Sequence, residues 1–115
     1  MNPLVEISCP PSGNFVIARL KGEIDMTSAP GIRAMLARAV PNAAVGLVVD
    51  LSAVSYLDSA GMRLLFDVKR DLQHHRQRLR LVVPEDAPIQ RTVEIVNLGG
   101  HVALHSTLTA ALAAP

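Results

Sequence analysis

Residues 48–62 read VVDLSAVSYLDSAGM, and this segment sets the architecture of the chain. The apolar run Val45–Leu51 predicts a buried central strand, covered on both faces or flanked by neighbours on both edges. A short loop should follow, and then Asp58 and Ser59 should open an amphipathic helix that runs from about Ala60 to Gln77. The inner stripe of that helix is formed by Gly61, Leu64, Leu65, Val68 and Leu72. A hydroxyl at the start of a helix is held by the backbone and lies among amide donors that suit an anion.

Upstream of this segment, the sequence predicts a hairpin and a helix. Leu4–Ser8 and Phe15–Lys21 are strand candidates, and the turn residues of Pro10–Asn14 separate them. Gly22-Glu23-Ile24-Asp25 ends the second strand. Thr27 and Ser28 then precede Ala29-Pro30, which predicts a helix with a hydroxyl cap. Its apolar face contains Ile32, Met35, Leu36, Ala39 and Val40, and Pro41-Asn42 ends it.

Downstream, two more strands alternate with two more helices. Leu79–Val83 is a strand, and a helix over Pro88–Asn97 ends at Gly99-Gly100. A short strand over His101–His105 precedes a last helix over Thr107–Ala113, for which Ser106 is the expected cap. The order is β-β-α-β-α-β-α-β-α, which predicts a small α/β domain: a mixed sheet of four to five strands with about four helices, antiparallel only in the opening hairpin.

Composition narrows the class of protein. The 115 residues fit one domain, half of them hydrophobic but only 3% aromatic, so the core should be aliphatic. A formal charge of +1 argues against strong capture of nucleic acid. Cys9 is the single cysteine, which suits a reducing compartment. With no secretion signal and no apolar run of membrane-spanning length, a cytoplasmic protein is expected.

Four segments together resemble the STAS domain family, and most of all its bacterial anti-sigma factor antagonists. They are residues 47–52 (LVVDLS), residues 56–62 (YLDSAGM), Gly22-Glu23-Ile24-Asp25 and Asn97-Leu98-Gly99-Gly100. The likeness spans nearly the whole chain and implies a single STAS domain over residues 1–115. Two positions depart from the family pattern: Ala60 stands where a second serine is frequent, and Met62 stands where leucine is usual.

The resemblance implies a switch rather than an enzyme. The serine that matches Ser59 is phosphorylated in the family by a partner that is both anti-sigma factor and serine kinase. The unmodified antagonist binds this partner and frees the sigma factor, the phosphorylated form does not bind, and a serine phosphatase resets it. The implied partner-binding residues are Asp25, Asp58, Ser59, Ala60, Gly61 and Met62. No cofactor, metal, nucleic acid or membrane insertion is implied.

Other readings of these residues stay open. Asp58 or Ser59 could be an ordinary helix cap, which is compatible with modification. Asp25 and Asp50 could serve only turn chemistry at strand ends, although the resemblance places both near the phosphorylation loop. The same fold also serves as an accessory subunit of lipid-transporting ABC assemblies, whose STAS subunits often carry threonine at the position of Ser59.

The remaining polar and apolar candidates give weaker signals. Ser59 lacks a Gly-x-Ser-x-Gly elbow, and no pattern places a histidine beside it. His101 and His105 lack ligand partners at metal spacing. The basic residues near the end of the long helix are read as a solvated surface: Lys69, Arg70, Arg76, Arg78 and Arg80. Ile95 and Leu98 are expected outside the inner stripe of the third helix, where they would extend a partner surface, form a homodimer, or pack against the last helix.

Overall fold

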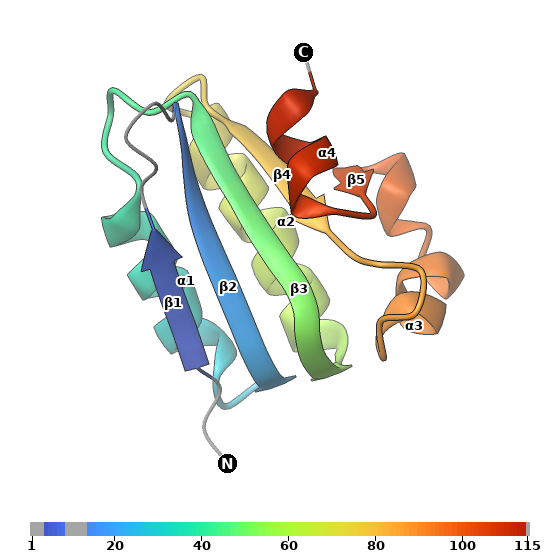
Figure 1. Cartoon of the computed structure of the whole chain (residues 1–115). Helices are drawn as coiled ribbons and strands as arrows, with labels where there is room; N and C mark the ends of the chain where they lie inside the picture. The colour runs from blue at the N-terminus through green and yellow to red at the C-terminus, as the bar shows by residue number, and fades with distance from the viewer. Residues whose placement is uncertain (1–3, 9–13, 115) are drawn as a thin grey trace.

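A five-stranded sheet forms the centre of the computed structural model, which describes residues 4–8 and 14–114 (Figure 1). The strands lie side by side in chain order, with β1 antiparallel to β2 and the other neighbours parallel. Their bounds are Leu4–Ser8 (β1), Phe15–Ile24 (β2), Gly46–Leu57 (β3), Arg78–Val82 (β4) and Ala103–His105 (β5). The predicted mixed sheet with one antiparallel pair is therefore confirmed, whereas most of the predicted turn over Pro10–Asn14 lies outside the described residues.

Helices flank both faces of the sheet, but unequally (Figure 1). The two long helices lie together on one face, and α4 lies on the opposite face near the end of the chain. The helices are α1 (Ala29–Ala39), α2 (Ser59–Gln73), α3 (Gln90–Ile95) and α4 (Leu108–Ala113), with a 3₁₀ turn over Leu98–Gly100. The predicted order of elements is confirmed.

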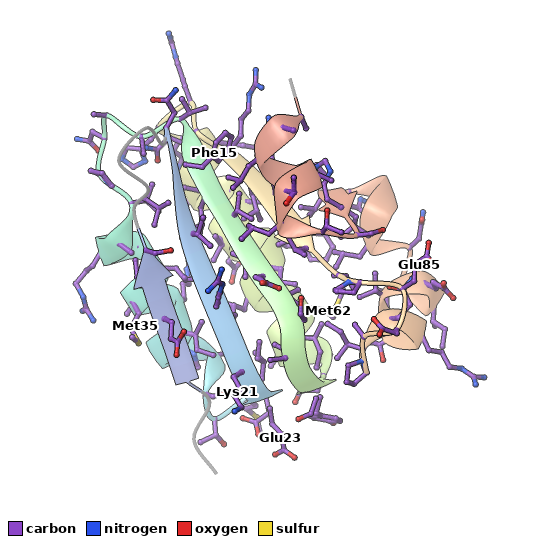
Figure 2. All side chains as sticks on the ribbon, in the orientation of Figure 1. Phe15, Lys21, Glu23, Met35, Met62 and Glu85 are labelled. Carbon is purple, nitrogen blue, oxygen red and sulfur yellow. The ribbon has the colours of Figure 1, made fainter. Side chains whose placement is uncertain are left out.

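Strand periodicity divides the apolar residues between two cores. Successive strand residues point to opposite faces, so alternate residues of β2 to β4 meet α1 and α2. The main core contains, among others, Leu20, Ile24, Leu47, Val49, Leu51, Leu65 and Leu81. A smaller cluster on the other face joins Ile17, Val48 and Val82 to Ala111 of α4. Phe15 packs against this smaller cluster from the start of β2 (Figure 2).

Strand β3 extends through residues predicted to be a loop. The expected strand ended at Leu51, but β3 continues to Leu57 because β2 pairs with it along nearly its full length. Irregularities in the register between Arg19 and Lys21 and between Gly22 and Glu23 accommodate residues that break the strict alternation. This part of the strand was not predicted because Ser52, Ser55 and Tyr56 are polar and exposed, as loop residues usually are.

Several predicted boundaries of the helices are wrong by a few residues. Helix α2 ends at Gln73 rather than Gln77, and the left-handed backbone of Arg76 (φ 56°) turns the chain toward β4. Gln77 is buried and its amide donates to the carbonyls of Pro41 and Ala44, which fixes the turn before β3. Helix α3 is shorter than predicted; of the two residues expected outside its inner stripe, Leu98 is fully buried in the main core and Ile95 is 72% exposed.

Three further expectations about single residues are corrected. Ser28 does not cap α1 through its hydroxyl, which accepts from the Asp25 amide instead. Thr107 rather than Ser106 caps α4, accepting from the Ala110 amide at 3.0 Å. Arg80 is not part of a solvated surface: it is buried, donates to the Ala111 carbonyl at 2.7 Å and lies over the Phe15 ring. The hydrogen bond to Ala111 joins α4 to β4.

Candidate functional site

Ser59 is the first residue of α2 and is exposed at the end of the sheet where β2 and β3 finish. Within the described residues its hydroxyl makes no hydrogen bond to the protein. The first intrahelical bond runs from the Met62 amide to the Asp58 carbonyl at 2.9 Å, so the earlier amides of this turn stay outside the helical ladder. An incoming group can therefore reach the oxygen of Ser59 without displacing a structural hydrogen bond.

Asp58 is the N-cap of α2. Its backbone is extended (φ −94°, ψ −171°), and its Oδ1 accepts from the Gly61 amide at 3.0 Å. The Asp58 amide donates to the Ile24 carbonyl at 3.3 Å, which ties the start of α2 to the end of β2. The cap reading of the sequence thus applies to Asp58, and it leaves the neighbouring hydroxyl of Ser59 available.

Asp25 lies at the same edge of the sheet as Ser59. It follows Ile24, and Asp58 follows Leu57, which is the Cα partner of Ile24 in the parallel β2–β3 pair. The Asp25 carboxylate accepts from the amides of Thr27 (2.9 Å) and Ser28 (3.0 Å). These bonds, first that of Ser28, hold the pKa of Asp25 below its usual value of 3.8. Asp25 therefore organises the turn before α1 as an ionised carboxylate.

A groove between the first turns of α1 and α2 adjoins the serine. Its floor is apolar, made by Ala29, Pro30, Ala60 and Leu64, while Arg33, Arg63 and Asp67 form its polar part. Met26 lines its edge with 76% of its surface exposed, the largest exposed fraction among the large apolar side chains described. Sequence reasoning missed Met26. The available signal was a lone large apolar residue in the polar turn that follows Asp25.

Acidic and arginine side chains join α1 to α2 beside the groove. Arg33 donates two hydrogen bonds of 3.0 Å to Asp71 and one of 3.5 Å to Asp67. The Arg33 guanidinium holds the pKa of the Asp71 carboxyl below its usual range. Asp67 also contacts Arg70 at 2.9 Å and Arg63 at 4.0 Å. This network joins α1, which follows the turn that contains Met26, to α2, which begins at Ser59.

Three predicted residues, Gly61, Met62 and Asp50, are not part of the exposed surface around Ser59. Gly61 and Met62 belong to the first turn of α2 but are buried, while Ala60 is partly exposed beside Ser59. Asp50 is not at a strand end: it lies in the middle of β3, where its carboxylate accepts from the Ser52 amide and lies 3.9 Å from Arg19. The structure therefore brings Asp25, Asp58, Ser59 and Ala60 together and leaves Asp50 apart. Lys21 and Glu23, by contrast, lie near the carboxyl end of β2 (Figure 2).

Histidines do not assemble a catalytic or metal site in the described part of the chain. His101 packs edge-on against Phe66 with ring centroids 5.6 Å apart, and the ring of His75 meets the Asp71 carbonyl at 3.2 Å. Across residues 4–8 and 14–114, no three metal-ligating side chains of His, Cys, Asp or Glu gather in one place. Over the same ranges, no helix combines the length and the apolar character needed to cross a bilayer.

The sheet order and the helix positions define a small α/β domain with an exposed serine at the start of α2. Comparison with known families identifies it further: the model of the STAS domain matches residues 6–111. The chain belongs to the STAS domain family. No curated protein matches the sequence.

Solved structures with the same fold include anti-sigma factor antagonists. One from Mycobacterium paratuberculosis is 26% identical with a TM-score of 0.82, over 96% of this chain and 92% of that one. SpoIIAA in its unphosphorylated form is 22% identical, with a TM-score of 0.70 over 92% of this chain and 91% of that one. The Bacillus cell fate determinant SpoIIAA in its phosphorylated form is 21% identical, with a TM-score of 0.64 over 93% and 96%.

Proposed function

We propose that this protein is an anti-sigma factor antagonist controlled by phosphorylation of Ser59. In the unmodified form it binds an anti-sigma factor that is also a serine kinase, and binding releases the sigma factor. The observation that carries the proposal is that Ser59 is exposed and that its hydroxyl makes no hydrogen bond to any residue the structure describes. The similarity to an antagonist from Mycobacterium paratuberculosis supports the same class of partner.

The chemical step is transfer of the γ-phosphoryl group of ATP to Ser59. The serine oxygen forms a bond to the γ-phosphorus while the bond to the bridging oxygen breaks and ADP leaves. The hydroxyl proton passes to a base of the kinase or to water. A serine phosphatase reverses the modification by hydrolysis, which returns the hydroxyl and releases inorganic phosphate.

The phosphate can be tolerated within the protein and still prevent docking. It adds about −1.5 to −2 charges at a helix start, where the backbone dipoles favour negative charge. A partner packed on Ser59 would have to desolvate that charge next to the carboxylate of Asp58. A loss of about 3 kcal/mol in binding free energy would weaken the complex roughly 100-fold.

Mapping the modified residue tests the proposal. The full chain is incubated with ATP and an anti-sigma factor kinase of the same organism, and the phosphopeptide is identified by mass spectrometry. We expect label on Ser59, none in Ser59→Ala, and undiminished label in Ser55→Ala, which removes an exposed hydroxyl four residues earlier on β3. Label on another residue, or equal affinity of the kinase for the modified and unmodified protein, would contradict it.

A further inference from the structure

We propose that Arg63 receives the phosphate of phosphorylated Ser59 and leaves Asp67 in order to do so. This inference rests on the function proposed above and adds how this particular chain registers the modification. It makes Arg63 a residue that responds to the phosphate, whereas in the unmodified protein Arg63 belongs to the groove between α1 and α2.

The spacing on α2 places the two side chains within reach. Ser59 and Arg63 are four residues apart in a continuous helix, so they lie on the same face with Cβ atoms about 5–6 Å apart. Side chains on a helix lean toward its N-terminus, which directs Arg63 over the turn that contains Ser59. The side chain of Arg63 is 83% exposed and is free to change rotamer.

The present partner of Arg63 holds it weakly. Asp67 lies 4.0 Å from Arg63, but 2.9 Å from Arg70 and 3.5 Å from Arg33. The carboxylate therefore keeps two closer arginines when Arg63 departs. A phosphate offers nearly twice the charge of a carboxylate and three strong acceptor oxygens, which match the fork of a guanidinium. The exchange favours the phosphate.

The neighbouring arginines are poor substitutes for Arg63. Arg33 lies on α1 and donates two hydrogen bonds to Asp71 of α2, which hold its guanidinium in place. Arg70 stands eleven positions beyond Ser59 on the same helix, about 16 Å along its axis. Arg70 nevertheless has the same charge and contacts the same carboxylate as Arg63, so it provides a matched control for the loss of one positive charge from α2.

Movement of Arg63 toward the phosphate would also change the charge of the groove between α1 and α2. Arg63 and Asp67 line the groove together with Met26 and Ala60. When the guanidinium turns toward Ser59, the polar part of the groove loses one positive charge and exposes more of the Asp67 carboxylate. The modification at the start of α2 is thereby transmitted to the surface between α1 and α2.

A titration of the phosphate by ³¹P NMR tests the inference. Phosphoserine is installed at position 59 of the full chain during synthesis, without a kinase, and the second pKa of the phosphate, ordinarily about 6, is measured. We expect Arg63→Gln to raise that pKa by about 0.3 to 0.5 unit, because an exposed pair of this kind contributes a fraction of one pKa unit. Arg70→Gln should change it by less than about 0.1 unit.

Equal pKa values in Arg63→Gln, Arg70→Gln and the parent protein would overturn the inference, and so would equal shifts in both variants. Because the phosphoserine is built in, the titration reports on Arg63 whether or not a kinase acts on Ser59. Failure of kinase labelling would contradict the proposed function, but it would not affect what the titration says about Arg63.

Discussion

Asp58 supplies the side-chain bond that begins α2, accepting from the Gly61 amide at 3.0 Å. We expect Asp58→Ala to lower the free energy of unfolding by about 1 kcal/mol, because the amide loses its acceptor and a helix start is left uncapped. Asp58→Asn keeps an acceptor oxygen and should stay within about 0.3 kcal/mol of the parent. Urea denaturation followed by circular dichroism measures both, and equal stability of the alanine and asparagine variants would contradict the capping role.

Two glycines at the starts of the long helices should respond to alanine in opposite directions. A Cβ on Gly61 would collide with Leu57 Cδ1 and lie 3.0 Å from the Ile24 carbonyl oxygen, so Gly61→Ala should cost about 1–3 kcal/mol of folding stability. A Cβ on Gly31 in α1 meets nothing within 4 Å, and Gly31→Ala should stabilise the protein by about 0.5–1 kcal/mol. Thermal unfolding by calorimetry distinguishes the signs. A neutral or stabilising Gly61→Ala would mean that α2 does not pack this closely on the end of β2.

At the scale of single residues, the sequence indicated the centre of the site but not its surroundings. Asp58 and Ser59 could be predicted because a cap and the residue after it are local features of one helix start. Arg63 could not be predicted, and Met26 gave only the signal of a lone large apolar residue in a polar turn, because the groove exists only when α1 and α2 pack together. The position of Asp50 was predicted wrongly because the apolar run ends at Leu51. Pairing with β2 extends β3 to Leu57, so Asp50 lies within the strand.

The pairing of α1 with α2 depends in part on the Arg33–Asp71 ion pair, and this gives it a pH dependence. The pKa of Asp71 in the folded protein lies below its ordinary value of 3.8. The contribution of Asp71 to stability is therefore fully present above about pH 4 and is lost as the pH falls through the lower folded pKa. We expect Asp71→Asn to reduce stability at about pH 6 and to flatten the acid side of the stability curve below about pH 4.

Urea midpoints measured at several pH values check this prediction. Glu85→Gln is the control, since Glu85 is an exposed carboxylate in the turn before α3 (Figure 2) and forms no ion pair within the described residues. It should leave both the midpoint and the acid slope near those of the parent protein. If Asp71→Asn and the parent lose stability in parallel on acidification, the ion pair does not couple the two helices.

The differences between predicted and observed element boundaries show which parts of the fold can be predicted from the sequence. The inner stripe of α2 was predicted because 3.6-residue periodicity belongs to the helix alone. The far half of β3 was not, because its alternation is broken by irregular pairing and its polar residues look like a loop. The type and order of the elements depend on local pattern, whereas their ends depend on what the neighbouring strand or helix does.

Across the whole molecule, the site and the last helix lie at different places on the sheet. Ser59 adjoins the carboxyl ends of β2 and β3, while α4 packs on the opposite face from α1 and α2 through Ala111 and Arg80 (Figure 1). Gly61 is buried against Ile24 and Leu57 directly below the serine, so the surface that carries Ser59 rests on the main core. This scaffold is consistent with the proposed function, in which phosphorylation changes the surface charge without rearranging the fold.

Negative charge at position 59 should therefore leave the fold intact. We expect Ser59→Asp to change the free energy of unfolding by less than about 0.5 kcal/mol, because attraction by the helix start offsets repulsion from Asp58. In a domain of this size that corresponds to a shift of the thermal midpoint of no more than about 4 °C. Ser55→Asp places the same charge on an exposed strand position of β3, where aspartate is disfavoured, and should cost about 1 kcal/mol. Calorimetry on the two variants compares the positions directly. If Ser59→Asp were the more destabilised of the two, the loss of partner binding on phosphorylation would follow from unfolding of α2, and the switch would not be one of surface charge.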